Sequence, residues 1–416
     1  MRYPDFRRYL GARLLAAFAV EMQTVAIGWE VYAVTGNPLD LGLIGLSQFL
    51  PFIVLILPAG QLADRFDRRR IVLACFLLEA LCAALLLRFS LGGIQSAMPI
   101  FGVMALFGVA RAFSQPTGQA LLPNIVPAEA FGNAVAVNSS SLQVATIVGP
   151  ALGGLVFLAG APVVYGAVLA LLLAAAGLIA GLQHGGRGAA AALDSIGDML
   201  SGVRFVRGHP VVLGSISLDL FAVLFGGATA LLPVFASDVL RAGPTGLGLL
   251  RAAPAVGAAL AAGAVSFRPL RRRVGHTMFI SVAIFGFATL VFAISSSFLL
   301  SMVALAVLGA ADMVSVYIRH LLVQLETPDA IRGRVSAVNS VFIGASNELG
   351  EFESGVTAAL FGTVPAVIIG GVGTLVVAAL WAGLFPRLRR LDAFPPRAGL
   401  PVESRPTPES VPLSPP

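Results

Sequence analysis

Long apolar runs alternate with short charged clusters along almost the whole chain. From Ala130 to His184 no Asp, Glu, Lys or Arg occurs, and the only interruption is Gly160-Ala161-Pro162. A membrane-crossing helix needs about 20 apolar residues, so this run predicts two spans joined by a tight turn. Counting every run in this way predicts twelve membrane-spanning helices, at residues 9–34, 39–63, 71–89, 97–121, 132–158, 162–183, 211–236, 247–267, 277–297, 299–322, 334–361 and 364–385.

The arginines divide the connections between these spans into two kinds. All 27 basic residues are arginine, and they gather at every second connection. By the positive-inside rule these connections are cytoplasmic, so we expect a multi-pass protein of a bacterial inner membrane with both termini in the cytoplasm. The clusters are Arg2 to Arg8, Arg65 to Arg70, Arg187 to Arg207, Arg268 to Arg273, Arg332 with Arg334, and Arg387 to Arg397.

Composition excludes a soluble globular protein, because 57% of the residues are hydrophobic and only 12% are charged. The net charge of +6 is a signal of membrane topology. Nucleic-acid binding would need a contiguous basic face, which the pattern lacks, so the expected partner is the lipid bilayer. The arginine-rich start runs into a span that carries Glu21 and Glu30, unlike a signal peptide, so we expect the first helix to be retained.

Two halves of the chain repeat each other. The segment 127–139 matches the segment 328–340 at a displacement of 201 residues, and 60–70 has an echo in 263–273. An even number of spans separates the copies, so they share one orientation and predict two bundles with a binding site between them. We expect an N-terminal six-helix bundle (1–183), an amphipathic cytoplasmic connector (184–210), a C-terminal six-helix bundle (211–388) and a disordered proline-rich tail (389–416).

The connection between the second and third spans carries a distinctive motif. Its sequence, Gly60-Gln-Leu-Ala-Asp64-Arg65-Phe-Asp67-Arg68-Arg69-Arg70, resembles the signature loop of the major facilitator superfamily, apart from Asp67 at a position where that family usually has glycine. The resemblance implies an all-α membrane fold of two pseudo-symmetric bundles, in which this loop gates the cytoplasmic side. The alternative is an arginine cluster that only anchors the span. The predicted gating residues are Gly60, Asp64, Arg65, Arg68, Arg69 and Arg70.

The fifth span contains Gly149-Pro150-Ala-Leu-Gly153-Gly154, which resembles a motif associated with antiporters of that superfamily. Proline removes one internal hydrogen bond, and glycines permit bending and close packing. Generic small-residue packing is the competing interpretation. The second half has diverged here, to Gly350-Glu-Phe-Glu-Ser-Gly355.

Carboxylates far from the span ends are candidates for binding protons or substrate, because a charge in lipid is costly. Glu21 and Asp219 lie inside the first and seventh spans. Glu348 and Glu351 share one face of the eleventh span and disfavour each other's ionisation, which suits proton exchange. A structural pair with an arginine or a backbone partner is the alternative for each of them.

Arg111 and Asp312 occupy equivalent places in the two halves, in Gly108-Val-Ala-Arg111 and Gly309-Ala-Ala-Asp312. The resemblance implies that the fourth and tenth helices border the central cavity. We therefore expect these opposite charges to face each other, or a substrate, across it.

Together these features predict a secondary transporter with no cofactor, driven by the proton gradient. It is most similar to the branch of the superfamily that contains enterobactin and macrolide exporters, so we expect a monomeric, proton-coupled exporter of a drug, siderophore or metabolite. The alternatives are an uptake symporter and a non-transporting sensor. An ATP-driven pump is disfavoured by the absence of a phosphate-binding loop. A membrane-embedded enzyme is disfavoured because the four histidines have no metal-ligand spacing.

Overall fold

The computed structural model describes residues 3–183, 196–270, 272–328 and 331–395. All regular secondary structure among these residues is helical. The N-terminal half contains α1 (Pro4–Thr35), α2 (Pro38–Arg65), α3 (Arg68–Gly92), α4 (Met98–Ile125), α5 (Ala128–Val156) and α6 (Ala161–Ala180). The C-terminal half contains α8 (Pro210–Phe225), α9 (Leu232–Val234), α10 (Gly243–Phe267), α11 (Val274–Ile294), α12 (Phe298–Glu326), α13 (Arg332–Phe361), α14 (Thr363–Leu384) and α15 (Pro386–Arg389).

All twelve predicted spans are helical, and eleven of them are single regular helices through the span. Eleven stretches within the described residues are long and apolar enough to cross a membrane. The twelfth span, α13, is a continuous helix of 30 residues that falls short on hydropathy because it carries Asn347 and the carboxylates of Glu348, Glu351 and Glu353. A polar helix of membrane length is tolerated where its polar face lines a protein cavity.

The seventh span differs from its prediction as one continuous helix over 211–236. It ends as a regular helix at Phe225, passes through a 3₁₀ turn over Gly227–Leu231, and continues through α9 into a π-helical turn over Phe235–Val239. A side chain at Gly227 would lie 2.3 Å from the carbonyl oxygen of Gly350 in α13. The regular helix therefore ends where Gly227 lets the backbone of this span touch the backbone of Gly350 in α13.

The structure describes the second half of the connector and the first residues of the predicted tail. Helix α7 (Ile196–Gly208) lies between the two halves in the sequence and packs against α8 and α13 of the C-terminal bundle. There Arg334 donates a hydrogen bond of 3.3 Å to Ser201. The predicted tail begins at 389, but residues up to 395 pack on the C-terminal bundle, with the rings of Phe394 and Tyr317 6.4 Å apart. Residues 184–195 and 396–416 lie outside the described part of the chain.

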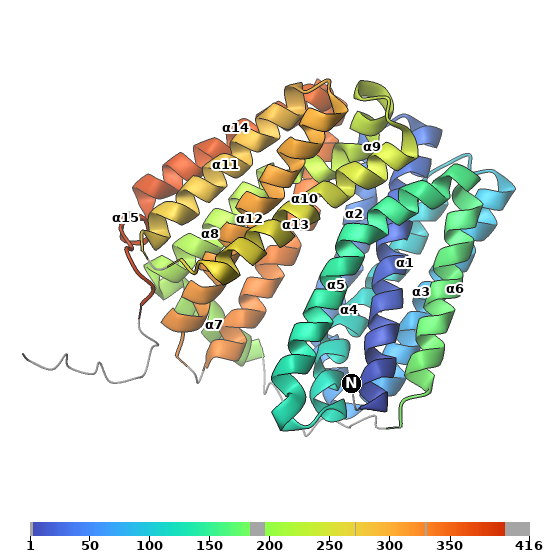
Figure 1. Cartoon of the computed structure of the whole chain (residues 1–416), viewed down its shortest axis with the longest axis horizontal. Coiled ribbons are helices and arrows are strands. Elements are labelled where there is room, and N and C mark those ends of the chain that lie inside the picture. The colour runs from blue at the N-terminus through green and yellow to red at the C-terminus, as the bar shows by residue number, and fades with distance from the viewer. Residues whose placement is uncertain (1–2, 184–195, 271, 329–330, 396–416) are drawn as a thin grey trace, which may run out of the picture.

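Figure 1 shows the two bundles leaning against each other at one end and diverging toward the end that carries the N-terminus. We call the closed end the Tyr32 end and the other the Arg69 end. The contacts between bundles are concentrated in two helix crossings, α5 with α10 and α2 with α13.

Glycines make both crossings close. A side chain at Gly154 of α5 would lie 2.4 Å from the carbonyl oxygen of Pro244 in α10, and one at Gly355 of α13 would lie 3.0 Å from the Cα atom of Gly42 in α2. The two crossings are equivalent under the internal repeat, so the bundles are in contact through two quasi-symmetric small-residue interfaces.

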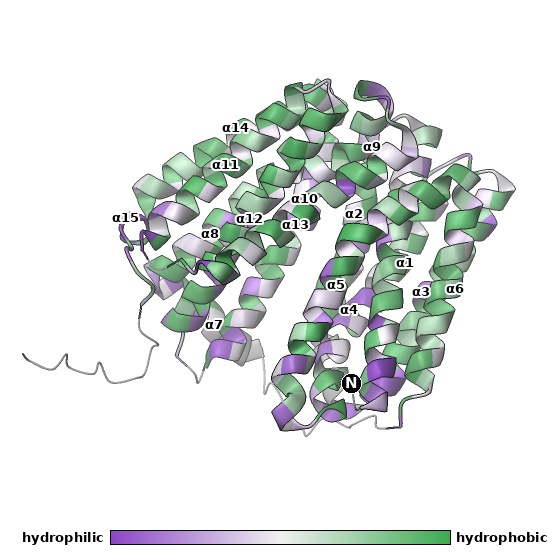
Figure 2. Ribbon diagram, in the orientation of Figure 1, coloured by the Kyte–Doolittle hydropathy of each residue, from purple (hydrophilic) through white to green (hydrophobic). Residues whose placement is uncertain are grey.

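Hydropathy is distributed as a bilayer requires. In Figure 2 the outward surfaces of both bundles are hydrophobic, while hydrophilic residues gather at the Arg69 end and around α15. Large apolar side chains such as Val54, Leu260 and Leu299 are more than two-thirds exposed. Exposed apolar surface on this scale identifies the lateral faces as lipid-facing.

Candidate functional site

A charged central cavity lies between the bundles. It consists of two adjoining hollows of about 220 and 450 Å³, both lined by Glu21 of α1, Arg251 of α10 and Glu351 of α13. The smaller hollow also borders Arg111 of α4, and the larger one borders Asp312 of α12. The fourth and tenth spans contribute lining residues, as the resemblance implied, and so do the first, second, fifth, seventh, eighth and eleventh.

Arg111 forms its ion pair with Glu348 of the opposite bundle, with 3.9 Å between Nη1 and Oε1. Both side chains are partly exposed to the cavity, at 32% and 21%. We expected Arg111 and Asp312 to face each other or a substrate. In this conformation Arg111 pairs with Glu348 of α13 instead, while both Arg111 and Asp312 line the cavity, so their role toward a substrate stays a prediction.

Glu348 and Glu351 face the same point on α2. One oxygen of each carboxylate lies 3.4 and 3.0 Å, respectively, from the position that a Cβ atom on Gly45 would occupy. Glycine at this position leaves room for both carboxylates, and the prediction that they share one helix face is confirmed. Two carboxylates held this close favour a state in which one of them carries a proton.

Glu21 reaches the cavity from the middle of α1, beneath the Gly149 motif. A side chain on Gly149 would lie 2.6 Å from the Cβ atom of Glu21, and one on Gly153 would lie 2.8 Å from the Cα atom of Met22. The first two glycines of the motif therefore let α5 approach α1, whereas Gly154 and Pro150 contact α10 of the other bundle. The motif thus links the position of Glu21 to the contact between bundles.

Arg251 is a functional candidate that the sequence analysis missed. It lies in α10 and lines both hollows, opposite the carboxylates of Glu21 and Glu351. A signal was present, because Arg251 is the one arginine inside the predicted span 247–267. A basic residue within a span is costly in lipid, as an acidic one is, so it is equally a candidate for a functional site.

Asp219 is directed into its own bundle. Its carboxylate forms an ion pair with Arg319 of α12, and both side chains are buried, with 9% and 3% exposed. The pair lies beside a small pocket of about 10 Å³ that Asp312 also lines. This arrangement favours the structural interpretation of Asp219, whereas Asp312 lies between that pocket and the central cavity.

The loop motif at the Arg69 end ties helices of the N-terminal bundle together. Asp67 caps α3 by accepting a hydrogen bond of 2.9 Å from the backbone N–H of Arg69, and it lies 3.8 Å from Arg70. Arg68 donates to the carbonyl oxygen of Ala120 at the end of α4, at 2.9 Å. The unusual Asp67 is therefore a helix cap.

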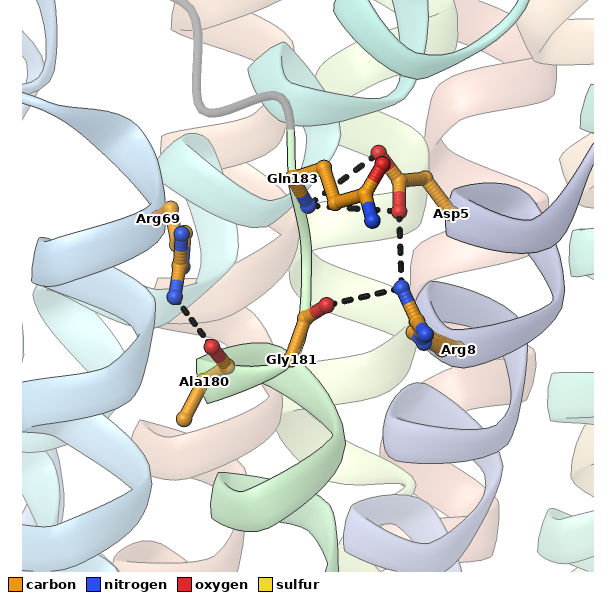
Figure 3. A network of polar contacts seen from close by, with 6 residues as sticks. All are labelled: Asp5, Arg8, Arg69, Ala180, Gly181 and Gln183. Atoms are coloured by element: carbon orange, nitrogen blue, oxygen red, sulfur yellow. Dashed lines mark hydrogen bonds and ion pairs between the residues drawn. The ribbon is translucent and has the colours of Figure 1, made fainter.

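Figure 3 shows how this motif meets the start of the chain at the end of α6. Arg69 donates a hydrogen bond to the carbonyl oxygen of Ala180, and Arg8 donates one of 2.8 Å to that of Gly181. Asp5 accepts from the backbone N–H of Gln183 and pairs with Arg8. Cations at a helix C-terminus are stabilised by the helix dipole, so these contacts hold α1 and α3 to α6.

The remaining gating predictions are not tested by this geometry. Gly60 and Asp64 lie in the last turns of α2, but their surroundings lie outside what the structure describes. Arg65 is exposed at the end of the same helix.

Comparisons with known proteins agree with this architecture. The sequence profile of a family described as transmembrane secretion effector matches residues 1–406. The multidrug efflux pump Tap of Mycolicibacterium fortuitum is 28% identical, over 92% of this chain and 96% of its own. The enterobactin exporter EntS of Citrobacter koseri is 25% identical, over 95% of each chain.

Solved structures show the same fold. A bacterial homologue of the human lysosomal transporter Spinster, in an inward-facing and occupied conformation, superimposes with a TM-score of 0.74 at 15% identity, covering 92% of this chain and 96% of the other. A D-xylose–proton symporter superimposes with a TM-score of 0.67 at 16% identity, covering 92% and 97%.

Two bundles of six helices around a charged cavity, with this set of relatives, define a membrane transporter and not an enzyme. The chain belongs to the transmembrane secretion effector family of the major facilitator superfamily. The predicted fold class is thereby confirmed.

Proposed function

We propose that this protein is a secondary active exporter that exchanges protons for a small amphipathic molecule by alternating access. The observation that carries the proposal is the cross-bundle ion pair of Arg111 with Glu348, beside the second carboxylate of Glu351. An ion pair that joins the moving halves at the binding site can couple protonation to their separation.

The coupling follows from charge balance in the cavity. In the smaller hollow Glu21, Glu348 and Glu351 face Arg111 and Arg251, so this hollow holds one negative charge in excess when all five groups are ionised. Proton uptake by the Glu348 and Glu351 pair removes the attraction for Arg111 and lets the bundles rearrange. Release of the proton restores the ion pair of Arg111 with Glu348. A cationic or zwitterionic substrate competes with the proton for the carboxylates of Glu348 and Glu351.

The conformation fits the loading state of an exporter. The bundles are in contact at the Tyr32 end, and the arginine clusters lie at the other end. With those clusters in the cytoplasm, the cavity of a protein in the bacterial inner membrane opens inward. Transport in the outward direction is further supported by the efflux and export roles named for Tap and EntS.

The test uses everted membrane vesicles that contain the full chain, with ethidium and a catecholate siderophore as probes. An imposed proton gradient should drive probe accumulation that an ionophore abolishes. Glu348→Gln should remove the dependence on the gradient while leaving downhill probe exchange intact. The matched control is Glu353→Gln, on the same helix, where the native side chain accepts a hydrogen bond of 2.7 Å from Thr357 and does not line the cavity.

Two results would contradict the proposal. Accumulation that continues after the gradient is collapsed would show that protons do not drive transport. Probe movement in the same direction as the protons, from the acidic to the alkaline side of the membrane, would identify a symporter.

A further inference from the structure

A second charged pocket lies far from the central cavity, at the Arg69 end of the C-terminal bundle. It has a volume of about 300 Å³ and is lined by Arg273 and His276 at the start of α11 and by Arg389, Arg390 and Asp392 in and after α15. All five side chains are exposed. Three arginines and one aspartate leave the pocket with two positive charges in excess.

The backbone holds these arginines in place. The N–H groups of Val274 and Gly275 donate hydrogen bonds of 3.2 and 2.9 Å to the carbonyl oxygens of Asp392 and Leu391. The N–H group of Arg273 donates one of 3.2 Å to the carboxylate of Asp392. The segment after α14 therefore closes over the first turn of α11, and the basic side chains project from a fixed frame.

The contact between this segment and α11 is close. A side chain on Gly275 would lie 1.9 Å from the carbonyl oxygen of Leu388, so glycine is required there. Leu388 is itself fully buried. The N–H groups of Arg273, Val274 and Gly275 at the helix start are thus already used, so the arginine side chains are the main donors to an anion in the pocket.

The chemistry of the pocket suits phosphate. Guanidinium groups bind phosphate oxygens through paired, charge-assisted hydrogen bonds. The volume lies at the lower limit of small-molecule sites, which is about 300 Å³. Two excess positive charges match one or two phosphodiester groups.

Two apolar stripes lead from the pocket along the outside of the bundle. On α11 the residues Ile280, Ile284 and Phe287 follow His276 on one helix face and are 45%, 43% and 64% exposed. On α14 the residues Leu380 and Leu384, which precede α15, are 53% and 67% exposed. In Figure 2 the hydrophilic segment around α15 directly adjoins the hydrophobic surfaces of α11 and α14.

We propose that Arg273, Arg389 and Arg390 form a binding site for the phosphate group of an anionic phospholipid, whose acyl chains lie along α11 and α14. A free phosphate ion would use the same arginines but would gain nothing from the apolar stripes. The site lies outside the transport cavity, and it does not depend on the direction or coupling of transport.

The test measures lipid retention by the purified full-length protein with native mass spectrometry. Phosphatidylglycerol and cardiolipin are added in parallel with phosphatidylcholine. The anionic lipids should be retained in preference to phosphatidylcholine. The double variant Arg389→Gln/Arg390→Gln should bind them about 30-fold more weakly, since each of the two arginines contributes about fivefold to the attraction of an anionic lipid. The matched control, Arg204→Gln/Arg207→Gln, removes two exposed arginines from α7 at the same end and should leave retention unchanged.

Two outcomes would overturn the proposal. Equal loss of lipid in both double variants would show an unspecific effect of net charge. Displacement of the lipid by excess inorganic phosphate would show a site for free anions. Thermal unfolding in neutral detergent is measured for every variant, and Arg273→Gln replaces the double variant if that one does not fold.

Discussion

Tyr32 at the end of α1 donates a hydrogen bond of 2.5 Å to the carboxylate of Asp238, in the π-helical turn of the opposite bundle. The bond joins the bundles at their closed end, near the contact of Gly28 with Pro233. It belongs to one conformation only, because separation of the bundles at this end breaks it. The free energy of this hydrogen bond therefore favours the conformation that is closed at the Tyr32 end over the one that is open there.

Removing this hydrogen bond should favour the state that is open at the Tyr32 end. Tyr32→Phe keeps the ring and removes the donor, and a bond of this kind contributes about 1 kcal/mol, which is about a fivefold change in population. The measurement is the distance between spin labels placed on the Tyr32 ends of α1 and α10. An unchanged distance distribution would mean that the bond does not contribute to closure.

Arg111 and Glu348 should be energetically coupled. Each single alanine substitution leaves one charge without its partner in the cavity, while the double substitution removes both. A double-mutant cycle on transport rate should give a coupling of roughly 0.5 to 3 kcal/mol. The parallel cycle of Arg111 with Asp312 should give a smaller value in this conformation. A larger value for Asp312 would show that the two residues meet in another state.

The Gly154 contact should control closure of the bundles. In Gly154→Ala the new methyl group would lie 2.4 Å from the carbonyl oxygen of Pro244, so α5 and α10 must separate. We expect slower transport and greater labelling of cysteines introduced at the Tyr32 end. Gly166→Ala in α6, where no atom lies within 4 Å of the new methyl group, is the matched control. If Gly154→Ala leaves the labelling of these cysteines unchanged, the contact of α5 with α10 at Gly154 does not control closure.

The buried pair of Asp219 and Arg319 should contribute to stability and not to the pH dependence of transport. Asp219→Asn leaves the buried guanidinium without its counter-charge, at a cost of about 3–5 kcal/mol. A combined Asp219→Leu/Arg319→Met protein should recover much of this loss. The measurement is the thermal unfolding midpoint in detergent, together with the pH profile of transport. A shifted pH profile in a stable variant would show that Asp219 takes part in proton transport.

Much of the fold follows from local sequence properties. Runs of apolar residues long enough to span a bilayer predicted all twelve helices, including α13 with its three carboxylates. The internal repeat placed Arg111 and Asp312 at equivalent positions, and the family resemblance placed those positions beside the cavity. These features are readable because length and hydropathy are set residue by residue, whatever the helix packs against.

The partners of the charged residues were decided only by the tertiary structure. Helical periodicity shows which residues share a face, as it did for Glu348 and Glu351, but not which neighbour that face meets. In the folded protein Arg111 pairs with Glu348 of α13. Asp219 pairs with Arg319 of α12 in its own bundle, and α10 places Arg251 at the cavity. A charge inside a span can face lipid, its own bundle or the cavity, and the packing of the other helices selects among these because each environment differs in its desolvation cost.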